Sequence, residues 1–145
     1  MAREQFGVCA EPNLHGNYLL FNVLDDKNAF IRAAVSRLPQ LFDNYAEQFS
    51  EANLIGVVAI GEAYWDEFYP HARPALLTSF PSMHSGDRVA PMTHYDIYVE
   101  IRSDRADVNH IVSSKVCLLL GESVELIEQV QAFRFLDGRD LTGFV

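Results

Sequence analysis

The chain has 145 residues, the size of one ordinary domain, and 49% of them are hydrophobic, which is enough apolar surface for a core and excludes intrinsic disorder. Its net charge of −9 argues against a nucleic-acid partner, because a phosphate backbone needs a basic face to neutralise it. No stretch has the length of a membrane span or the pattern of a signal peptide, so we expect a cytoplasmic protein with no membrane partner.

The first part of the chain predicts two strands on either side of a helical segment. Residues 18–24 (YLLFNVL) are apolar and aromatic and precede a polar turn, which predicts a strand that leads into a helix. Between residues 30 and 49 apolar side chains recur every three or four residues, and Pro39 should kink or split that helix. Residues 54–60 (LIGVVAI) predict a short strand buried on both sides.

A long connection follows in the middle of the chain. Residues 61–70 (GEAYWDEFYP) predict a short helix that Pro70 ends. Residues 71–91 are rich in Pro, Ser and Gly. Long connections of this kind inside a domain are often functional or cover another part of the protein.

The next segment predicts a strand and a helix. Residues 96–102 alternate between apolar and polar side chains, which predicts a strand with one wet face. Ser103 and Asp104 are candidate N-caps for a helix with apolar positions at helical spacing, and Gly121 is its natural end.

A fourth strand completes the predicted fold. It covers residues 124–132, Glu128 interrupts its apolar phase, and a bulge or strand end is expected near Phe133. The order of elements is that of a ferredoxin-like, split βαβ domain of the α+β class, with an antiparallel sheet and helices on one face. Since two of the strands are apolar on both sides, the second sheet face should need a cover from another domain or a partner subunit.

The residue types alone reveal no active site. No pair of the five histidines has a metal-binding spacing (His15, His71, His84, His94 and His110). A surface or partly buried structural role is favoured for His110, and a loop role for His71 and His84, although these two could line a cleft. The aromatic residues between Tyr64 and Tyr69 favour core packing. Cys9 and Cys117 fit a reducing compartment, while a disulfide between them stays open.

The last residues, 133–145 (FRFLDGRDLTGFV), run through a polar turn to an apolar end, which suggests that the sequence is cut there. The run from Arg139 to Val145 resembles the segment leading into the GxxDG motif of dye-decolorizing-type (DyP) haem peroxidases. Gly143 would be the first glycine of the motif, with Phe144 and Val145 at its variable positions. Further segments resemble the family and extend the match over nearly the whole chain (Gln5–Val8 with Glu11, Val57–Gly61 with Trp65, Asp87–Pro91, Asp96, and Asp107 with Val108).

The resemblance implies that residues 1–145 are the N-terminal ferredoxin-like domain of a bacterial member, truncated within the GxxDG motif. This domain would be one half of a dimeric α+β barrel-type peroxidase. Members of the family hold haem b in the second half, where the proximal histidine and distal arginine lie. We therefore assign no catalytic residue and no metal ligand here, and expect Gly143, Phe144 and Val145 to contact the cofactor on its distal side.

The implied function is reduction of hydrogen peroxide and oxidation of a small aromatic or dye-like substrate. The partners would be the C-terminal half of the same protein and further copies in a homo-oligomer, and the chain alone should be inactive. The alternative is a non-catalytic ferredoxin-like module that binds a partner or dimerises through its open sheet face. A third possibility is a small cofactor-free oxygenase with a pocket under residues 71–91.

Overall fold

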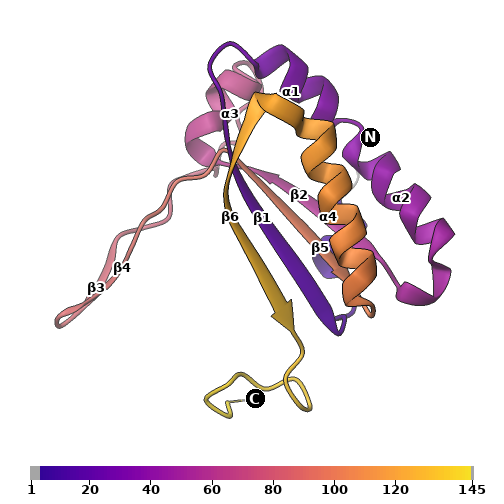
Figure 1. Cartoon of the computed structure of the whole chain (residues 1–145). Coiled ribbons are helices and arrows are strands. Elements are labelled where there is room, and N and C mark those ends of the chain that lie inside the picture. Colours follow the sequence, from indigo (N-terminus) through magenta and orange to yellow (C-terminus); the bar gives the residue numbers. More distant parts are fainter. Residues whose placement is uncertain (1–3, 145) are drawn as a thin grey trace.

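The computed structural model describes residues 4–144. These residues form a four-stranded sheet, and Figure 1 shows helices packed on the sheet and a long arm leading away from it. The elements of the main body are η1 (Phe6–Cys9), β1 (His15–Val23), α1 (Asn28–Val35), α2 (Leu38–Gln48), η2 (Ser50–Ala52), β2 (Ile55–Ile60), α3 (Glu62–Phe68), β5 (Ile97–Ser103), α4 (Ala106–Leu120), η3 (Gly121–Ser123) and β6 (Val124–Phe133).

The sheet has the strand order β2-β5-β1-β6, and every neighbouring pair is antiparallel. The first and third strands of the body therefore lie side by side in the middle, and the second and fourth form the edges. This topology confirms the predicted ferredoxin-like α+β fold.

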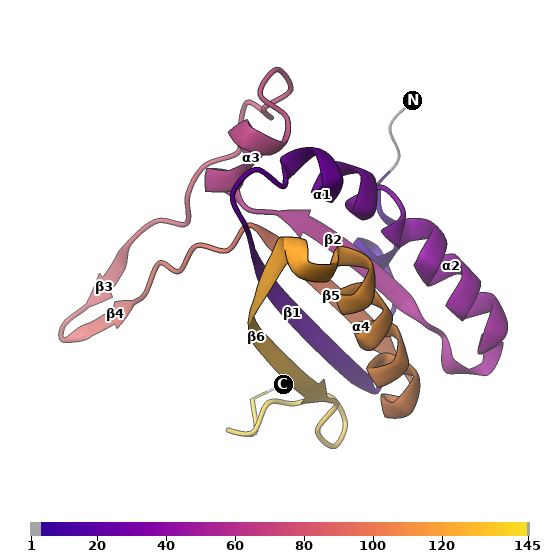
Figure 2. The same ribbon diagram turned by 45° about the horizontal axis from the view of Figure 1, so that its top comes forward.

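Helices α1, α2 and α4 cover a single face of the sheet, as Figure 2 shows. The core lies between this layer and the inward side chains of the two central strands, such as Leu19, Phe21, Val99 and Ile101. On α4, Val108, Val112, Val116 and Leu120 are fully buried, at the spacing that places them on one side of a helix. The alternation along residues 97–103 is confirmed, since its apolar positions are all buried.

The predicted break at Pro39 is also confirmed. Helix α1 ends at Val35 and α2 begins at Leu38, so that Pro39 occupies the first turn of α2. Proline is tolerated there because the backbone N–H groups of a first turn have no partner within the helix.

Two local predictions are wrong. Strand β2 is not buried on both sides, since only Val57 of its six residues is buried, and the reason is its place at the edge of the sheet. The N-cap of α4 is Arg105 rather than Ser103 or Asp104. The Ser103 hydroxyl accepts the Arg105 backbone N–H at 3.1 Å, and Asp104 bonds to other segments.

The strand end predicted near Phe133 is confirmed, because β6 ends at Phe133, and a bulge lies earlier in the strand. Leu20 of β1 pairs with Glu128 and Phe21 with Leu126, so Ile127 is the extra residue. The break in apolar phase at Glu128 marks this bulge, whereas Phe133 still pairs with His15 in regular register.

The long connection forms an arm, residues 71–95, which carries the hairpin of β3 (Met83–Ser85) and β4 (Arg88–Ala90). Both views show the hairpin of the arm extending away from the sheet and its helices (Figures 1 and 2). The first residues of the arm stay beside α3, where Arg73 pairs with Glu62 and Asp66. The hairpin therefore covers none of the helix-bearing face. Among the helices of residues 4–144, none combines the length and apolar character that crossing a bilayer demands.

Candidate functional site

The sheet face opposite the helices carries a line of polar and aromatic side chains. The Tyr98 hydroxyl donates to the Glu100 carboxylate at 3.1 Å. Glu100 forms an ion pair with Arg102 at 2.9 Å, and Arg102 in turn donates to the carbonyl of Gly7. These three residues alternate with the buried positions of β5, so they share the side turned away from the helices. We call this side the open face.

Tyr18 continues this line onto the neighbouring strand. Its ring centroid lies 6.1 Å from that of Tyr98, within the range of favourable aromatic contacts. Burial raises the pKa of the Tyr98 hydroxyl, and the negative charge of Glu100 raises it further. Tyr98 therefore stays protonated at neutral pH and acts as a hydrogen-bond donor.

The N-terminal segment covers the β2 end of the open face. The Gln5 side-chain amide donates to the Val58 carbonyl at 2.7 Å and accepts the Val58 N–H at 2.9 Å, which satisfies backbone groups at the edge of the sheet. Gly7 packs so tightly that a Cβ there would lie 2.5 Å from Val57 Cγ2. The part of the open face made by β1 and β6 has no such cover within residues 4–144.

Beyond β6 the chain turns back beside the open face. The Arg134 N–H donates to the Leu14 carbonyl at 2.7 Å, which fixes the end of the strand. The carboxylate of Asp137 then binds Arg139 through two hydrogen bonds, a geometry that fixes the planar guanidinium. The Asp137 carbonyl also accepts from Arg134 at 3.2 Å.

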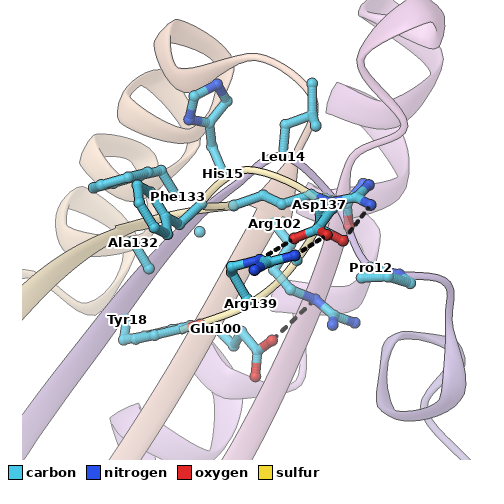
Figure 3. Close-up of a pocket in the computed structure, with 15 residues that line it drawn as sticks. Pro12, Leu14, His15, Tyr18, Glu100, Arg102, Ala132, Phe133, Asp137 and Arg139 are labelled. Atoms are coloured by element: carbon cyan, nitrogen blue, oxygen red, sulfur yellow. Dashed lines mark hydrogen bonds and ion pairs between the residues drawn. The ribbon is translucent and has the colours of Figure 1, made fainter. Parts of the chain in front are cut away.

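This turn and the open face enclose a pocket of about 480 Å³, drawn in Figure 3. Its walls combine aromatic side chains with charged ones, among them Tyr18, Glu100, Arg102, Phe133 and Arg139.

The last described residues form what we call the strap, residues 140–144. Its Asp140 N–H donates to the Phe144 carbonyl at 3.0 Å, and the Gly143 N–H donates to the Asp140 carbonyl at 3.0 Å. Gly143 has a φ of +91°, and a Cβ there would meet no atom within 4 Å. Leu141 and Phe144 are 78% and 77% exposed. The strap thus presents a bare backbone and two apolar side chains, and Val145 lies outside the described residues.

Of the five histidines considered in the sequence analysis, one lines this pocket and the other four lie elsewhere. His15 lines it, while His71, His84, His94 and His110 are exposed elsewhere. Within residues 4–144 no three His, Cys, Asp or Glu side chains come together as a metal site. Cys9 and Cys117 are both free thiols, and the aromatic cluster packs into the core through Tyr64 and Phe68, as predicted.

Asp104 ties three segments together near this site, and its removal should show a pH-dependent effect. Its carboxylate accepts from the Leu14 N–H at 3.1 Å and from the Asn53 amide at 2.7 Å. The hydrogen bond from Asn53 is the main cause of its lowered pKa. A depressed folded pKa gives stability that is present above about pH 4 and lost as the pH falls below it.

We expect Asp104→Ala to lower the free energy of unfolding at pH 7, because the hydrogen bonds from Leu14 and Asn53 are lost. The loss should be only about 1 kcal/mol, because solvent screens most of the carboxylate's charge. At pH 2.5 Asp104 is partly protonated in the wild type, so the two proteins should differ less in their free energy of unfolding. Urea unfolding at both pH values measures it, and an equal loss at both would contradict the role of the charge.

Sequence reasoning did not single out the open-face line or Asp140. The signal for the first was present, since Tyr98, Glu100 and Arg102 form the wet side of a predicted strand. What could not be seen is that Tyr18 and the C-terminal turn lie beside them, because this depends on strand pairing and on the path of the chain after β6.

Comparisons with known proteins point to one family. The sequence profile described as "Dyp-type peroxidase, N-terminal" matches residues 5–134. The dye-decolorizing peroxidase of Mycobacterium tuberculosis is 30% identical over 128 residues, which cover 88% of this chain and 38% of that protein.

Solved structures agree with this result. A DyP-type peroxidase protein from Shewanella oneidensis is 45% identical with a TM-score of 0.95, over 100% of this chain and 47% of that one. A DypB variant from Rhodococcus jostii RHA1, solved in complex with heme, is 25% identical with a TM-score of 0.87, over 94% of this chain and 45% of that one. The chain therefore spans less than half the length of these relatives.

Proposed function

Because this chain belongs to the Dyp-type peroxidase family, we propose that it forms the N-terminal half of a haem-dependent peroxidase. The complete protein would reduce hydrogen peroxide and oxidise small aromatic or dye-like compounds. Solved relatives of about twice its length, one of them named as a complex with heme, support a second half that completes the site. The activity would belong to both halves together.

The observation that carries the proposal is the strap, which follows directly on the turn that lines the open-face pocket. A porphyrin is flat and largely apolar, and the bare backbone at Gly143 with the exposed side chains of Leu141 and Phe144 fits such a surface. When bound, haem would supply the redox chemistry, as cofactors do in general. Gly143, Phe144 and Val145 are the residues of this chain that we propose to hold its distal side.

The residues of the open face would have a supporting role. Tyr18, Tyr98 and Val130 would pack against the second half and exclude water from the site. Glu100 and Arg102 form an ion pair, so covering them with the second half would leave neither charge without a partner. The free thiols of Cys9 and Cys117 fit a cytoplasmic, reducing location.

We further propose that the complete protein forms a homo-oligomer in which the arm contacts another copy. The arm exposes large apolar side chains, of which Leu76 is 92% exposed. An isolated two-stranded hairpin is only marginally stable in water. Contact with a second copy would stabilise it.

Haem titration of the complete protein, expressed with the residues that follow Val145 in its gene, tests the proposed function. We expect one haem per chain, a Soret band and peroxide-dependent oxidation of an aromatic dye, because the site needs groups from both halves. The 145-residue chain should show neither stoichiometric haem binding nor turnover. Absence of haem binding by the complete protein, or full activity of the 145-residue chain, would overturn the proposal.

A further inference from the structure

The shape of the strap depends on one carboxylate oxygen. Oδ1 of Asp140 accepts the Thr142 N–H at 2.9 Å, the Thr142 hydroxyl at 2.6 Å and the Phe144 N–H at 3.1 Å. All hydrogen bonds described for residues 140–144 join members of the strap to one another. The strap therefore takes its shape from its own sequence and not from the sheet.

This arrangement fixes the two features that face outward. The bond from the Phe144 N–H to Asp140 closes the loop across Gly143, which has its φ of +91°. The side chains of Leu141 and Phe144 then point into solvent instead of packing on the body. Five residues that make no tertiary hydrogen bond would otherwise sample many conformations, and ordering them on binding costs free energy.

We propose that Asp140 is a positioning residue, which holds the strap in its binding conformation before a cofactor contacts Gly143 and Phe144. This inference rests on the proposed function. The physical reason is that an ionised carboxylate accepts hydrogen bonds only, and such charge-assisted bonds are stronger than neutral ones. Asp140 itself does not need to touch the cofactor, since it acts through the backbone of the residues that do.

The neighbouring acidic residue has a different role. The Asp137 carboxylate is bound by Arg139 and shapes the turn before the strap. Loss of the Asp137 carboxylate would change the turn that precedes the strap, but residues 142–144 would keep their hydrogen-bond acceptor on Asp140.

The test compares Asp140→Ala, Asp140→Asn and Asp43→Ala in the complete protein. Asn keeps an oxygen acceptor at the same place, and Asp43 is an exposed carboxylate on α2 that serves as the control. Amide hydrogen exchange of the haem-free protein reports the order of the strap, and the rate of haem transfer to apomyoglobin reports the hold on the cofactor.

We expect Asp140→Ala to increase the rate of amide hydrogen exchange at Thr142 and Phe144 by about tenfold, because all three hydrogen bonds to the Asp140 carboxylate are lost. The rate of haem loss should also increase by about tenfold. Asp140→Asn should fall within about threefold of the wild type, as rescue by a conservative change requires. Asp43→Ala should match the wild type. The inference is overturned if Asp140→Ala matches Asp43→Ala in exchange, or if exchange rises while haem loss does not. Failure of the proposed function is distinct, since the wild type itself would then hold no haem.

Discussion

Val130→Arg on β6 is expected to lower the haem content of the complete protein by about tenfold or more. Val130 pairs with Tyr18, so it belongs to the open face, and it is 38% exposed in this chain. If the second half covers this face, the new charge would be buried without a partner, which costs several kcal/mol. Haem absorbance per protein after purification measures the effect.

Gln129→Arg is the matched control for this experiment. Gln129 is the neighbouring residue of the same strand and pairs with Leu19, so its side chain points to the other side of the sheet, where it is exposed at the edge. The same charge there should leave the haem content unchanged. Equal haem content in the two variants would mean that the open face is not the docking surface.

Gly61→Ala should lower the stability of the fold by about 3 kcal/mol, the upper end for overpacking. The Gly61 N–H donates to the Asp96 carbonyl at 2.8 Å, which draws the backbone before α3 against the backbone before β5. A Cβ at Gly61 would lie 1.9 Å from the Tyr95 carbonyl oxygen. Since the obstacle is backbone, the two segments must separate, and we expect the melting temperature to fall by about 10 °C.

Gly16→Ala provides the comparison, because a Cβ at Gly16 would meet the Tyr18 ring at 3.4 Å, an ordinary contact. Its melting temperature should stay within about 2 °C of the wild type. Thermal unfolding followed by circular dichroism measures the melting temperatures of both variants. A Gly61→Ala protein as stable as Gly16→Ala would show that the close approach of these segments is not needed.

Features that depend on a single periodic segment could be predicted from the sequence. The alternation of residues 97–103 and the apolar spacing along α4 are both strong, and each agrees with the burial observed. The position of Pro39 correctly predicted a kink or break in the helical segment, because a proline is compatible with only a few places in a helix.

Features that depend on neighbours could not be predicted in this way. Residues 55–60 are apolar throughout, yet their exposure is set by their place at the sheet edge. The cap of α4 is likewise decided by Leu14 and Asn53, which engage Asp104 from distant segments. The hairpin of β3 and β4 has no alternating apolar pattern from which it could be predicted.

The same distinction applies to the residues of the candidate site. Gly143 and Phe144 could be singled out only by their resemblance to a family motif, since a glycine in a polar turn is otherwise unremarkable in sequence. Asp140 lies in the segment that leads into this motif, but its role depends on backbone geometry. Its hydrogen bonds therefore become visible only when the path of the chain is known.

The most direct test of the account is an experimental structure of the complete protein with haem bound. It should place Gly143 and Phe144 within about 4 Å of the porphyrin, and the second half should cover Tyr18, Tyr98 and Val130. A structure in which the haem lies away from residues 140–144, with this sheet face open to solvent, would contradict the account.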